Sequence, residues 1–522
     1  MEGVYKKESG AYMQKVIEIK DGIARKPEWR MKTPVNFELL SGEQLAVIGK
    51  NASGKSMFID MLTGKHPLVS DNSLKYDFSP NNHKYASDNI KYIRFKDSYG
   101  SDTDRAYYMQ QRWNQGELGD SYITVAHKVK TEYGNLLKKV AEDDAYMRLY
   151  NMFSIDAIMD KRIISLSSGE LRRLILALAI LNQPRILIID NPFIGLDCQT
   201  REMLKAILKT LCETQTIQLI LVVDEHKEIP DFITHVIEVC NMSVMPKQTR
   251  EEYVSRHNIT AAEDASHGYD RRSEIIKLPY GSDKKSFSYE YAIRMRDVTI
   301  SYGNNLILNK INWCVKNGER WAITGRNGSG KSTLLSIVCA DNPQSYACDV
   351  TLFDKRRGCG ESIWEIKRHI GYVSPEMHRA FKHDIPAINI VRSGLDDSKV
   401  RNRRLTEETS ALCHFWMDRF GIEHLAERTF LKMSSGEQRL VLLARAFVKD
   451  PELLILDEPL HGLDNDNKTL ANNIIDAFCE RKNKTLIVVT HYKEELPRCI
   501  DRELKLKNHK IFKYINLQNY SL

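Results

Sequence analysis

The feature that most constrains the fold is a stretch, Lys432–Asp464, that occurs twice in the chain in altered form. Each copy reads as a small Ser-Ser-Gly-Glu loop, an apolar helix, and a short apolar strand that ends in an aspartate. In both copies the loop serine precedes that aspartate by twenty-three positions and a further aspartate by thirty, at Ser167, Asp190 and Asp197, and at Ser434, Asp457 and Asp464. Equal offsets in two halves indicate tandem copies of one domain.

The second copy has the features of a site for an anionic ligand. The continuous apolar run Leu453–Leu456 is typical of a parallel strand that is buried on both faces. It ends in Asp457 and Glu458, and the carboxyl ends of such strands are where open α/β sheets hold their ligands. The small side chains of Ser434–Gly436 leave backbone N–H groups at a helix start free to face an anion. We therefore expect a nucleotide site here.

Two glycine-rich loops match the phosphate-binding pattern G-x-x-x-x-G-K-[S/T], one in each half. The first, Gly49–Ser56, follows the apolar strand Gln44–Ile48 and precedes the apolar helix Met57–Leu62. The second, Gly325–Thr333, follows the strand Trp321–Thr324. In such loops the glycines let backbone N–H groups wrap the phosphates, the lysine reaches the terminal phosphates, and the serine hydroxyl can ligate magnesium.

The loops and the acid-ended strands supply the first candidate site residues. The predicted ATP-binding residues of the loops are Gly49, Asn51, Gly54, Lys55, Ser56, Gly325, Asn327, Gly328, Ser329, Gly330, Lys331, Ser332 and Thr333. The predicted ligands of Mg²⁺, whose preferred donors are oxygens, are Ser56, Asp190, Ser332 and Asp457. ATP and Mg²⁺ are the expected cofactors.

At 522 residues the chain is too long for a single core. We place two nucleotide-binding domains at 12–245 and 291–522, and between them a charged linker at 246–290 that is interrupted by glycine and proline. The predicted fold is α/β, with two tandem P-loop domains, each of which has a mixed-sheet core and a helical subdomain. A helical pattern over Thr124–Met159 predicts a helical subdomain in the first half.

Composition excludes several classes of protein. The net charge of +7, from 76 basic and 69 acidic residues, permits contact with a polyanion but gives no strong nucleic-acid signal. The ten cysteines form no C-x-x-C pair, which argues against a disulfide framework or a zinc site. The N-terminus lacks the apolar core of a signal peptide, and no apolar run reaches the roughly 18 residues of a transmembrane segment. We expect the chain to be cytoplasmic. Peripheral binding at the inner face of the cell membrane would require a separate membrane protein as partner.

With both phosphate loops, both Ser-Ser-Gly-Glu loops and both acid-ended strands in the same order, the chain resembles the ATP-binding cassette (ABC) ATPases. The resemblance covers nearly all of the chain apart from the linker and parts of the inserts. It implies two cassettes that pair head-to-tail within the chain and close over two ATP molecules. Each ATP would lie between the phosphate loop of one half and the opposite Ser-Ser-Gly-Glu loop. This adds the ATP-binding candidates Ser167, Ser168, Gly169, Glu170, Ser434, Ser435, Gly436 and Glu437.

In the second-half site the resemblance implies distinct roles for individual residues. Lys331 neutralises phosphate charge, and Glu458 orients or deprotonates the attacking water. His491 follows a strand, as the family's γ-phosphate-sensing histidine does, and Tyr302 stands where the family stacks an aromatic ring on adenine. The predicted catalytic residues are therefore Glu458, His491 and Lys331, and Tyr302 joins the ATP-binding residues.

The first-half site departs from this pattern at the catalytic base. Asn191 stands where the second half has Glu458, and a neutral amide cannot accept a proton. Loss of a positioned general base costs about 10²- to 10⁴-fold in rate. We therefore predict that this site binds ATP and hydrolyses it slowly or not at all. The competing hypothesis is that Asp224, Glu225 or His226 substitutes for the missing base.

Other departures concern the contacts around the two sites. Asp224-Glu225-His226 stands where the counterpart of Thr490-His491 is expected, and its histidine comes one position later than His491 would predict. In addition, no aromatic residue is found near Ala24 to stack on adenine. The glutamine through which cassettes couple to a partner is replaced in both halves, by Phe-Lys at 95–96 and by Pro-Glu at 375–376. This replacement argues against ordinary coupling to a membrane permease.

Three functions fit these features, and all of them need ATP. The first is the ATP-binding component of an ABC transporter, of the molybdate type by resemblance, working with separate membrane permease subunits. The second is a soluble twin-cassette factor that acts on the ribosome. That branch has a long continuous helical linker, whereas this linker is broken at Gly268, Pro279 and Gly281. The third is a DNA or regulatory ATPase, for which no aromatic–basic nucleic-acid motif is found. We favour them in that order.

Overall fold

The computed structural model describes residues 14–516, except 52, 81–84, 95–123, 141–143, 164–165, 167, 194–195, 197, 214–216, 225–227, 261–286, 304, 376, 378–383 and 396–406. The chain divides into two compact units. Unit 1 comprises residues 1–99 and 121–268, and unit 2 comprises residues 100–120 and 269–522. The predicted domain and linker bounds stay a prediction. The functional candidates outside the described residues are Ser167, Asp197, Glu225, His226, Glu376 and the pair at 95–96.

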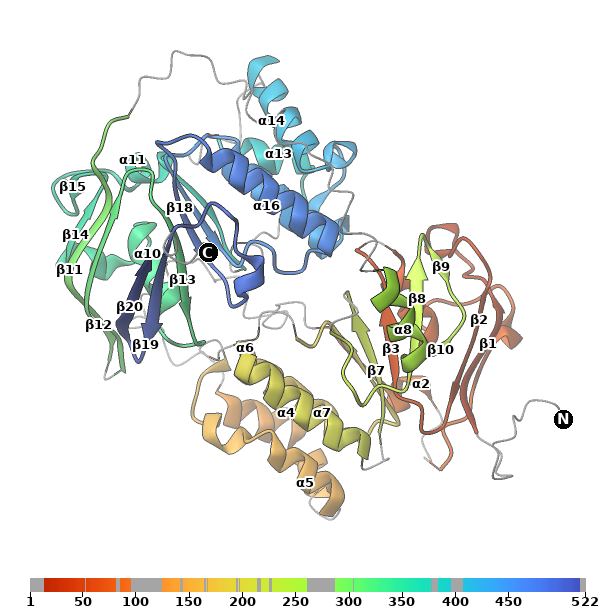
Figure 1. Cartoon of the computed structure of the whole chain (residues 1–522). Helices are drawn as coiled ribbons and strands as arrows, with labels where there is room; N and C mark the ends of the chain where they lie inside the picture. Colours follow the sequence, from red (N-terminus) through yellow and green to blue (C-terminus); the bar gives the residue numbers. More distant parts are fainter. Residues whose placement is uncertain are drawn as a thin grey trace. The chain divides into compact units, whose positions relative to one another are not determined.

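The described residues of unit 1 form two sheets (Figure 1). The smaller sheet is antiparallel in the order β2-β1-β4, with β1 at Lys15–Gly22, β2 at Val35–Leu40 and β4 at Leu74–Tyr76. The larger sheet is mixed in the order β10-β8-β3-β7-β6-β5, and β9 pairs with β8. Its strands are β3 (Leu45–Ile48), β5 (Ile90–Arg94), β6 (Ile186–Asp190), β7 (Gln218–Val223), β8 (His235–Cys240), β9 (Ser243–Val244) and β10 (Gln248–Thr249).

The helices of unit 1 include those expected after the phosphate loop and after the Ser-Ser-Gly-Glu loop. They are α1 (Lys55–Leu62), α2 (Ala86–Asn89), α4 (Val125–Val140), α5 (Asp144–Met152), α6 (Ser168–Ile180), α7 (Cys198–Glu213) and α8 (Arg250–Thr260). Helices α4 and α5 confirm the helical pattern predicted over 124–159.

Unit 2 repeats this plan. Its antiparallel sheet has the order β12-β11-β14-β15, with strands β11 (Tyr291–Tyr302), β12 (Asn305–Lys316), β14 (Asp349–Leu352) and β15 (Lys355–Arg356). Its mixed sheet has the order β16-β17-β18-β13-β19-β20, with strands β13 (Arg320–Gly325), β16 (Ile370–Val373), β17 (Leu453–Asp457), β18 (Thr485–Val489), β19 (Arg502–Lys507) and β20 (Lys510–Asn516). Its helices are α10 (Lys331–Val338), α11 (Ile363–Arg368), α13 (Ala387–Arg392), α14 (Glu407–Arg419), α15 (Ser435–Phe447) and α16 (Asn465–Cys479).

The strand orders confirm the repeat that the sequence predicts. The parallel series β8-β3-β7-β6-β5 of unit 1 corresponds strand for strand to β19-β13-β18-β17-β16 of unit 2. In each unit the strand before the phosphate loop lies next to the strand that follows the acid-ended strand, so the loop and the acids meet at one sheet edge. The predicted α/β class with mixed sheets is confirmed.

Each mixed sheet is buried on both faces because successive side chains of a strand point to opposite sides. In β17, Leu454 and Leu456 belong to a core that includes Phe478 of α16. Ile455 instead belongs to a second core with Leu335 of α10. Figure 1 shows α16 and α10 beside this sheet. The all-apolar strand predicted from the sequence is therefore explained by burial on both sides.

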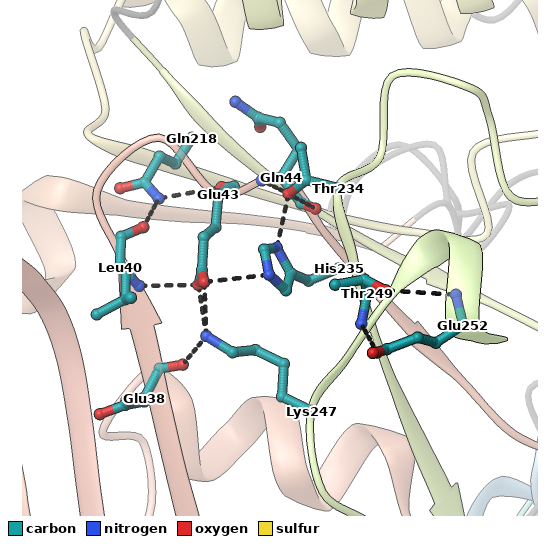
Figure 2. A network of polar contacts seen from close by, with 10 residues as sticks. All are labelled: Glu38, Leu40, Glu43, Gln44, Gln218, Thr234, His235, Lys247, Thr249 and Glu252. Atoms are coloured by element: carbon teal, nitrogen blue, oxygen red, sulfur yellow. Dashed lines mark hydrogen bonds and ion pairs between the residues drawn. The ribbon is translucent and has the colours of Figure 1, made fainter. Parts of the chain in front are cut away.

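A polar network holds the start of β3, the strand that leads to the phosphate loop of unit 1 (Figure 2). The buried Glu43 carboxylate accepts hydrogen bonds from Lys247 Nζ at 2.7 and 2.8 Å and from the Leu40 amide at 2.9 Å. His235 Nε2 lies 3.5 Å from the same carboxylate. Gln218 Nε2 donates to the carbonyls of Leu40 and Glu43. These bonds tie β3 to its neighbours β7 and β8 at the end opposite the loop.

Candidate nucleotide-binding site

The phosphate loop of unit 2 lies between β13 and α10. Gly330 has a φ of +99°, and a Cβ atom there would lie 2.8 Å from the carbonyl oxygen of Ile307, so only glycine fits. Lys331 Nζ donates to the carbonyls of Gly325 at 2.7 Å and Arg326 at 3.0 Å. The ammonium group is therefore held over the loop, where a bound phosphate would meet it.

The acid-ended strand of unit 2 is fixed by a buried arginine that sequence reasoning missed. Arg439 of α15 is 2% exposed, and its guanidinium donates to the carbonyls of Asp457 at 2.9 Å, Pro459 at 3.1 Å and Glu458. In unit 1, Arg172 of α6 donates to the Pro192 carbonyl at 2.8 Å. A buried arginine is costly without partners, so an arginine at the same place in two apolar helices was the available signal.

The structure brings together the predicted catalytic residues of unit 2. His491 Nε2 lies 3.1 Å from Glu458 Oε1, and the side chains are 6% and 18% exposed. Burial alone would raise the pKa of Glu458. The hydrogen bond from His491 and the positive charges of His461, His491 and Lys331 outweigh burial and lower that pKa to about 2. Glu458 is therefore an anion at neutral pH.

Magnesium would find few protein ligands in either unit, which is what this ion requires when it binds with nucleotide phosphates. In unit 2, Ser332 is exposed at the start of α10, and Asp457 is buried at the end of β17. Ser56 and Asp190 hold the equivalent positions in unit 1. One hydroxyl and one carboxylate per unit fit Mg²⁺. Among the described residues there is no cluster of three His, Cys, Asp or Glu side chains that would hold a metal unaided.

In unit 1 the phosphate-loop lysine has a charged partner. Lys55 Nζ donates to the carbonyls of Gly49 and Lys50 and also lies 3.0 Å from Asp224 Oδ1. The Asp224 and Lys55 side chains are 8% and 10% exposed. Asn191 Nδ2 donates to the other oxygen of Asp224 at 3.2 Å. The carboxylate is thus placed between the loop and the acid-ended strand.

The strand register corrects the expected equivalence between the two halves. Asp190 is paired with Val222, and Asp457 is paired with Val489. Asp224 and His491 each follow these valines by two positions, so Asp224 occupies the histidine's place and His226 lies two positions late rather than one. The sequences of the two halves were aligned one residue out of register because β7 and β18 both end in similar apolar residues.

Asp190 lies at the end of β6, close to Tyr92 and Asp224. The Tyr92 hydroxyl of β5 donates to Asp190 Oδ2 at 3.0 Å. Burial raises the pKa of Asp190, and the nearby charge of Asp224 raises it further, while Tyr92 and the positive charge of Lys55 oppose the change. The acidic side of the unit 1 site therefore carries two mutually repelling carboxylates.

Trp29, an aromatic residue that the sequence analysis did not find, packs on the segment that follows α1 in unit 1. Trp29 stacks on His66, with ring centroids 3.9 Å apart. His66 and Asn342 each lie eleven positions after the loop lysine of their unit, and Asn342 Nδ2 donates to the hydroxyl of Tyr302 at 2.9 Å. Trp29 thus contacts the position that Tyr302 contacts in unit 2. Trp29 was missed because the loop between β1 and β2 is longer than the loop between β11 and β12 in unit 2. This places Trp29 five residues beyond Ala24.

The Ser-Ser-Gly-Glu loop of unit 2 begins α15 with a capping box. Ser434 Oγ accepts from the Glu437 amide at 3.3 Å, and Glu437 Oε2 accepts from the Ser434 amide at 2.7 Å. In unit 1, Glu170 pairs with Lys161 at 2.7 Å. These contacts order the helix start. Their predicted role in binding the ATP of the other half stays a prediction.

Comparison with known proteins gives consistent results over both halves. The family model described as "ABC transporter" matches residues 33–194 and 308–461. The chain is 32% identical to the ABC transporter ATP-binding protein ModF of Escherichia coli, over 97% of this chain and 99% of that protein. An uncharacterized ABC transporter ATP-binding protein of Schizosaccharomyces pombe is 29% identical over 91% of this chain and 95% of its own length.

Among solved structures, an archaeal ribosome recycling factor in complex with a ribosomal stalk protein covers 96% of this chain and 90% of its own, with a TM-score of 0.51 and 17% identity. That likeness shows a similar fold. Within the described parts of this chain, every helix is too short or too polar to cross a bilayer.

Proposed function

This chain belongs to the ATP-binding cassette (ABC) family as a twin-cassette ATPase, and we propose that unit 2 hydrolyses ATP while unit 1 binds nucleotide with little or no turnover. One observation carries the proposal. Unit 2 pairs Glu458 with His491, whereas unit 1 pairs Asn191 with Asp224 at the equivalent positions.

In unit 2 each of these side chains has a separate role in the transfer of the terminal phosphoryl group to water. Lys331 binds the terminal phosphates, and Ser332 and Asp457 would hold magnesium, which neutralises charge that develops on the phosphate oxygens. Glu458, as an anion, accepts a hydrogen bond from the attacking water and orients it. His491 holds the Glu458 carboxylate in place at 3.1 Å.

Unit 1 has no side chain at the position of Glu458 that could accept a proton from the attacking water. The amide of Asn191 cannot take a proton from water, and a lost general base costs about 10²- to 10⁴-fold in rate. Asp224 is the competing candidate for the base. Lys55 and Asn191 engage its two oxygens, which favours a role in the loop's charge balance over one in proton transfer.

We further propose that the cassettes pair within the chain. By family resemblance, Ser434–Glu437 would complete the site of unit 1, and Ser167–Glu170 would complete that of unit 2. ATP would then join the units, and its hydrolysis would release them.

We propose that the cycle serves transport, with the chain as an ATP-binding component that meets separate permease subunits at the inner face of the membrane. The likeness over 97% of the chain to an ABC transporter ATP-binding protein supports the transport role, while the molybdate type is proposed from the sequence resemblance alone. The alternative is a soluble factor that acts on the ribosome, which the likeness to the recycling factor supports at the level of fold.

Purification of the native complex from cells tests the two functions against each other. An integral membrane protein that co-purifies in mild detergent supports transport. Co-sedimentation with ribosomes, reversed by hydrolysable ATP, supports the alternative. The ATPase assignment itself is tested by the steady-state turnover of Glu458→Gln.

A further inference from the structure

The carboxylate of Asp224 occupies the place where unit 2 presents the imidazole of His491, and there it faces the phosphate loop. Asp224 Oδ1 lies 3.0 Å from Lys55 Nζ, and both side chains are nearly buried. Lys55 therefore has its charge balanced by the chain itself. A phosphate that binds to this lysine must share it with the carboxylate or displace it.

The carboxylate is held in this position from a second side. Asn191 Nδ2 donates to Asp224 Oδ2 at 3.2 Å. Asn191 directly follows the acid-ended strand, so Asp224 is tied to that strand as well as to the phosphate loop. Asp224 thus sets a negative potential over the region where the terminal phosphate and its cation would lie.

We infer that Asp224 makes unit 1 select nucleotides by phosphate charge, taking a nucleoside diphosphate in preference to a triphosphate. This inference rests on the proposed nucleotide binding by unit 1 and names the nucleotide that it holds. The loop lysine reaches the terminal phosphates, so a γ-phosphate would come within a few ångströms of the carboxylate. A diphosphate ends one group earlier and lies farther from Asp224.

The repulsion is large enough to decide affinity. Two like charges about 4 Å apart in a partly buried site interact strongly enough to change a dissociation constant by well over tenfold. Unit 2 has Thr490-His491 at the same register, and its own carboxylate, Glu458, is paired with His491 at 3.1 Å. The preference for a diphosphate is therefore expected in unit 1 alone.

Isothermal titration of the full-length chain with ADP and with ATP, both with Mg²⁺, tests the inference. The Lys331→Ala background weakens phosphate binding in unit 2, so that unit 1 dominates the signal. We expect ADP to bind at least as tightly as ATP. Asp224→Asn should raise the affinity for ATP about tenfold or more and change that for ADP less than about threefold. Asp224→His, which installs the residue of unit 2, should act in the same direction.

Asp231→Asn is the matched control, since Asp231 is an exposed carboxylate of unit 1 and should change neither affinity. The inference is overturned if ATP binds unit 1 more than about tenfold tighter than ADP, or if both Asp224 variants shift the two nucleotides equally. Binding of neither nucleotide, with Lys55→Ala having no effect, overturns the proposed function of unit 1 instead. Thermal unfolding of each variant confirms that the chain is folded.

Discussion

Asn191 Nδ2 donates a hydrogen bond to Asp224 Oδ2 at 3.2 Å, at the register where the other unit places Glu458 and His491 3.1 Å apart. The carboxylate is therefore on the opposite member of the pair in unit 1. The residue after the acid-ended strand is the neutral Asn191, and the carboxylate belongs to Asp224, after the next strand. A hydrolytic site needs the negative group at the first position, to orient water. The reversal is the structural basis for assigning hydrolysis to unit 2.

Replacing His491 should change the pH dependence of hydrolysis as well as its rate. The pKa of Glu458 is lowered to about 2, in large part by the hydrogen bond from His491. In His491→Asn that pKa should rise toward the ordinary value of 4.5, so that activity is lost at a higher pH on the acid side. The measurement is kcat against pH, down to the lowest pH at which the chain stays folded. An unmoved acid limb, matching that of the exposed control His424→Gln, would contradict this account.

Removal of the buried arginine should destabilise unit 2. Arg439→Gln leaves the carbonyls of Asp457, Glu458 and Pro459 without their common donor. Buried groups left without a partner cost about 1–3 kcal/mol, so the free energy of unfolding should fall by that amount. Urea unfolding measures it. Arg356→Gln, at an exposed position of the same unit, should have almost no effect, and equal effects of the two variants would refute the assignment.

Acidification should weaken the network at the start of β3 (Figure 2). Burial lowers the pKa of His235 below 6.5, an effect that Glu43 opposes and Lys247 reinforces. The unfolded chain thus binds this proton more readily, so stability is lost as the pH falls through 6.5 toward the lowered value. Urea midpoints between pH 8 and pH 5, on the order of the range that histidine titration covers, should show a slope that His235→Gln reduces. An unchanged slope would rule out this source.

Trp29 should contribute to nucleotide binding through the base and not through the phosphates. Trp29→Ala is expected to weaken the binding of ADP and of ATP to unit 1 by the same factor, up to about tenfold, because a lost aromatic contact is independent of phosphate number. Titration in the Lys331→Ala background provides the comparison. Trp364→Ala, an exposed tryptophan of unit 2, is the control. A loss confined to ATP would mean that Trp29 acts elsewhere.

How much of the site the sequence could predict depended on the distance between residues along the chain. Gly325–Lys331 and the pair Asp457-Glu458 are each continuous, so their strand and loop context was visible in the sequence. Asn191 and Asp224 are thirty-three positions apart, and the pairing of β6 with β7 is what brings their side chains together. Because the ends of these strands are similarly apolar, an alignment error of one residue was enough to misplace the counterpart of His491.

Two other features lay outside what periodicity reveals. Arg439 is buried in a helix whose other buried side chains are apolar, and its role depends on backbone carbonyls that lie eighteen to twenty positions away in the sequence. Trp29 lies in a loop that is longer than its counterpart in unit 2, so it stands five residues beyond Ala24, near which the aromatic residue was expected. In both cases the missing information was a contact between separate segments of the chain.

The central claim, that one of the two sites hydrolyses ATP, is tested most directly by the steady-state turnover of Glu458→Gln beside wild type. Asn191→Asp serves as the matched change in unit 1. We predict that Glu458→Gln lowers kcat by about 10²-fold or more, because it removes the only glutamate or aspartate at that position in either unit. Residual hydrolysis near half of the wild-type rate would contradict the account and assign turnover to unit 1, with Asp224 as its base.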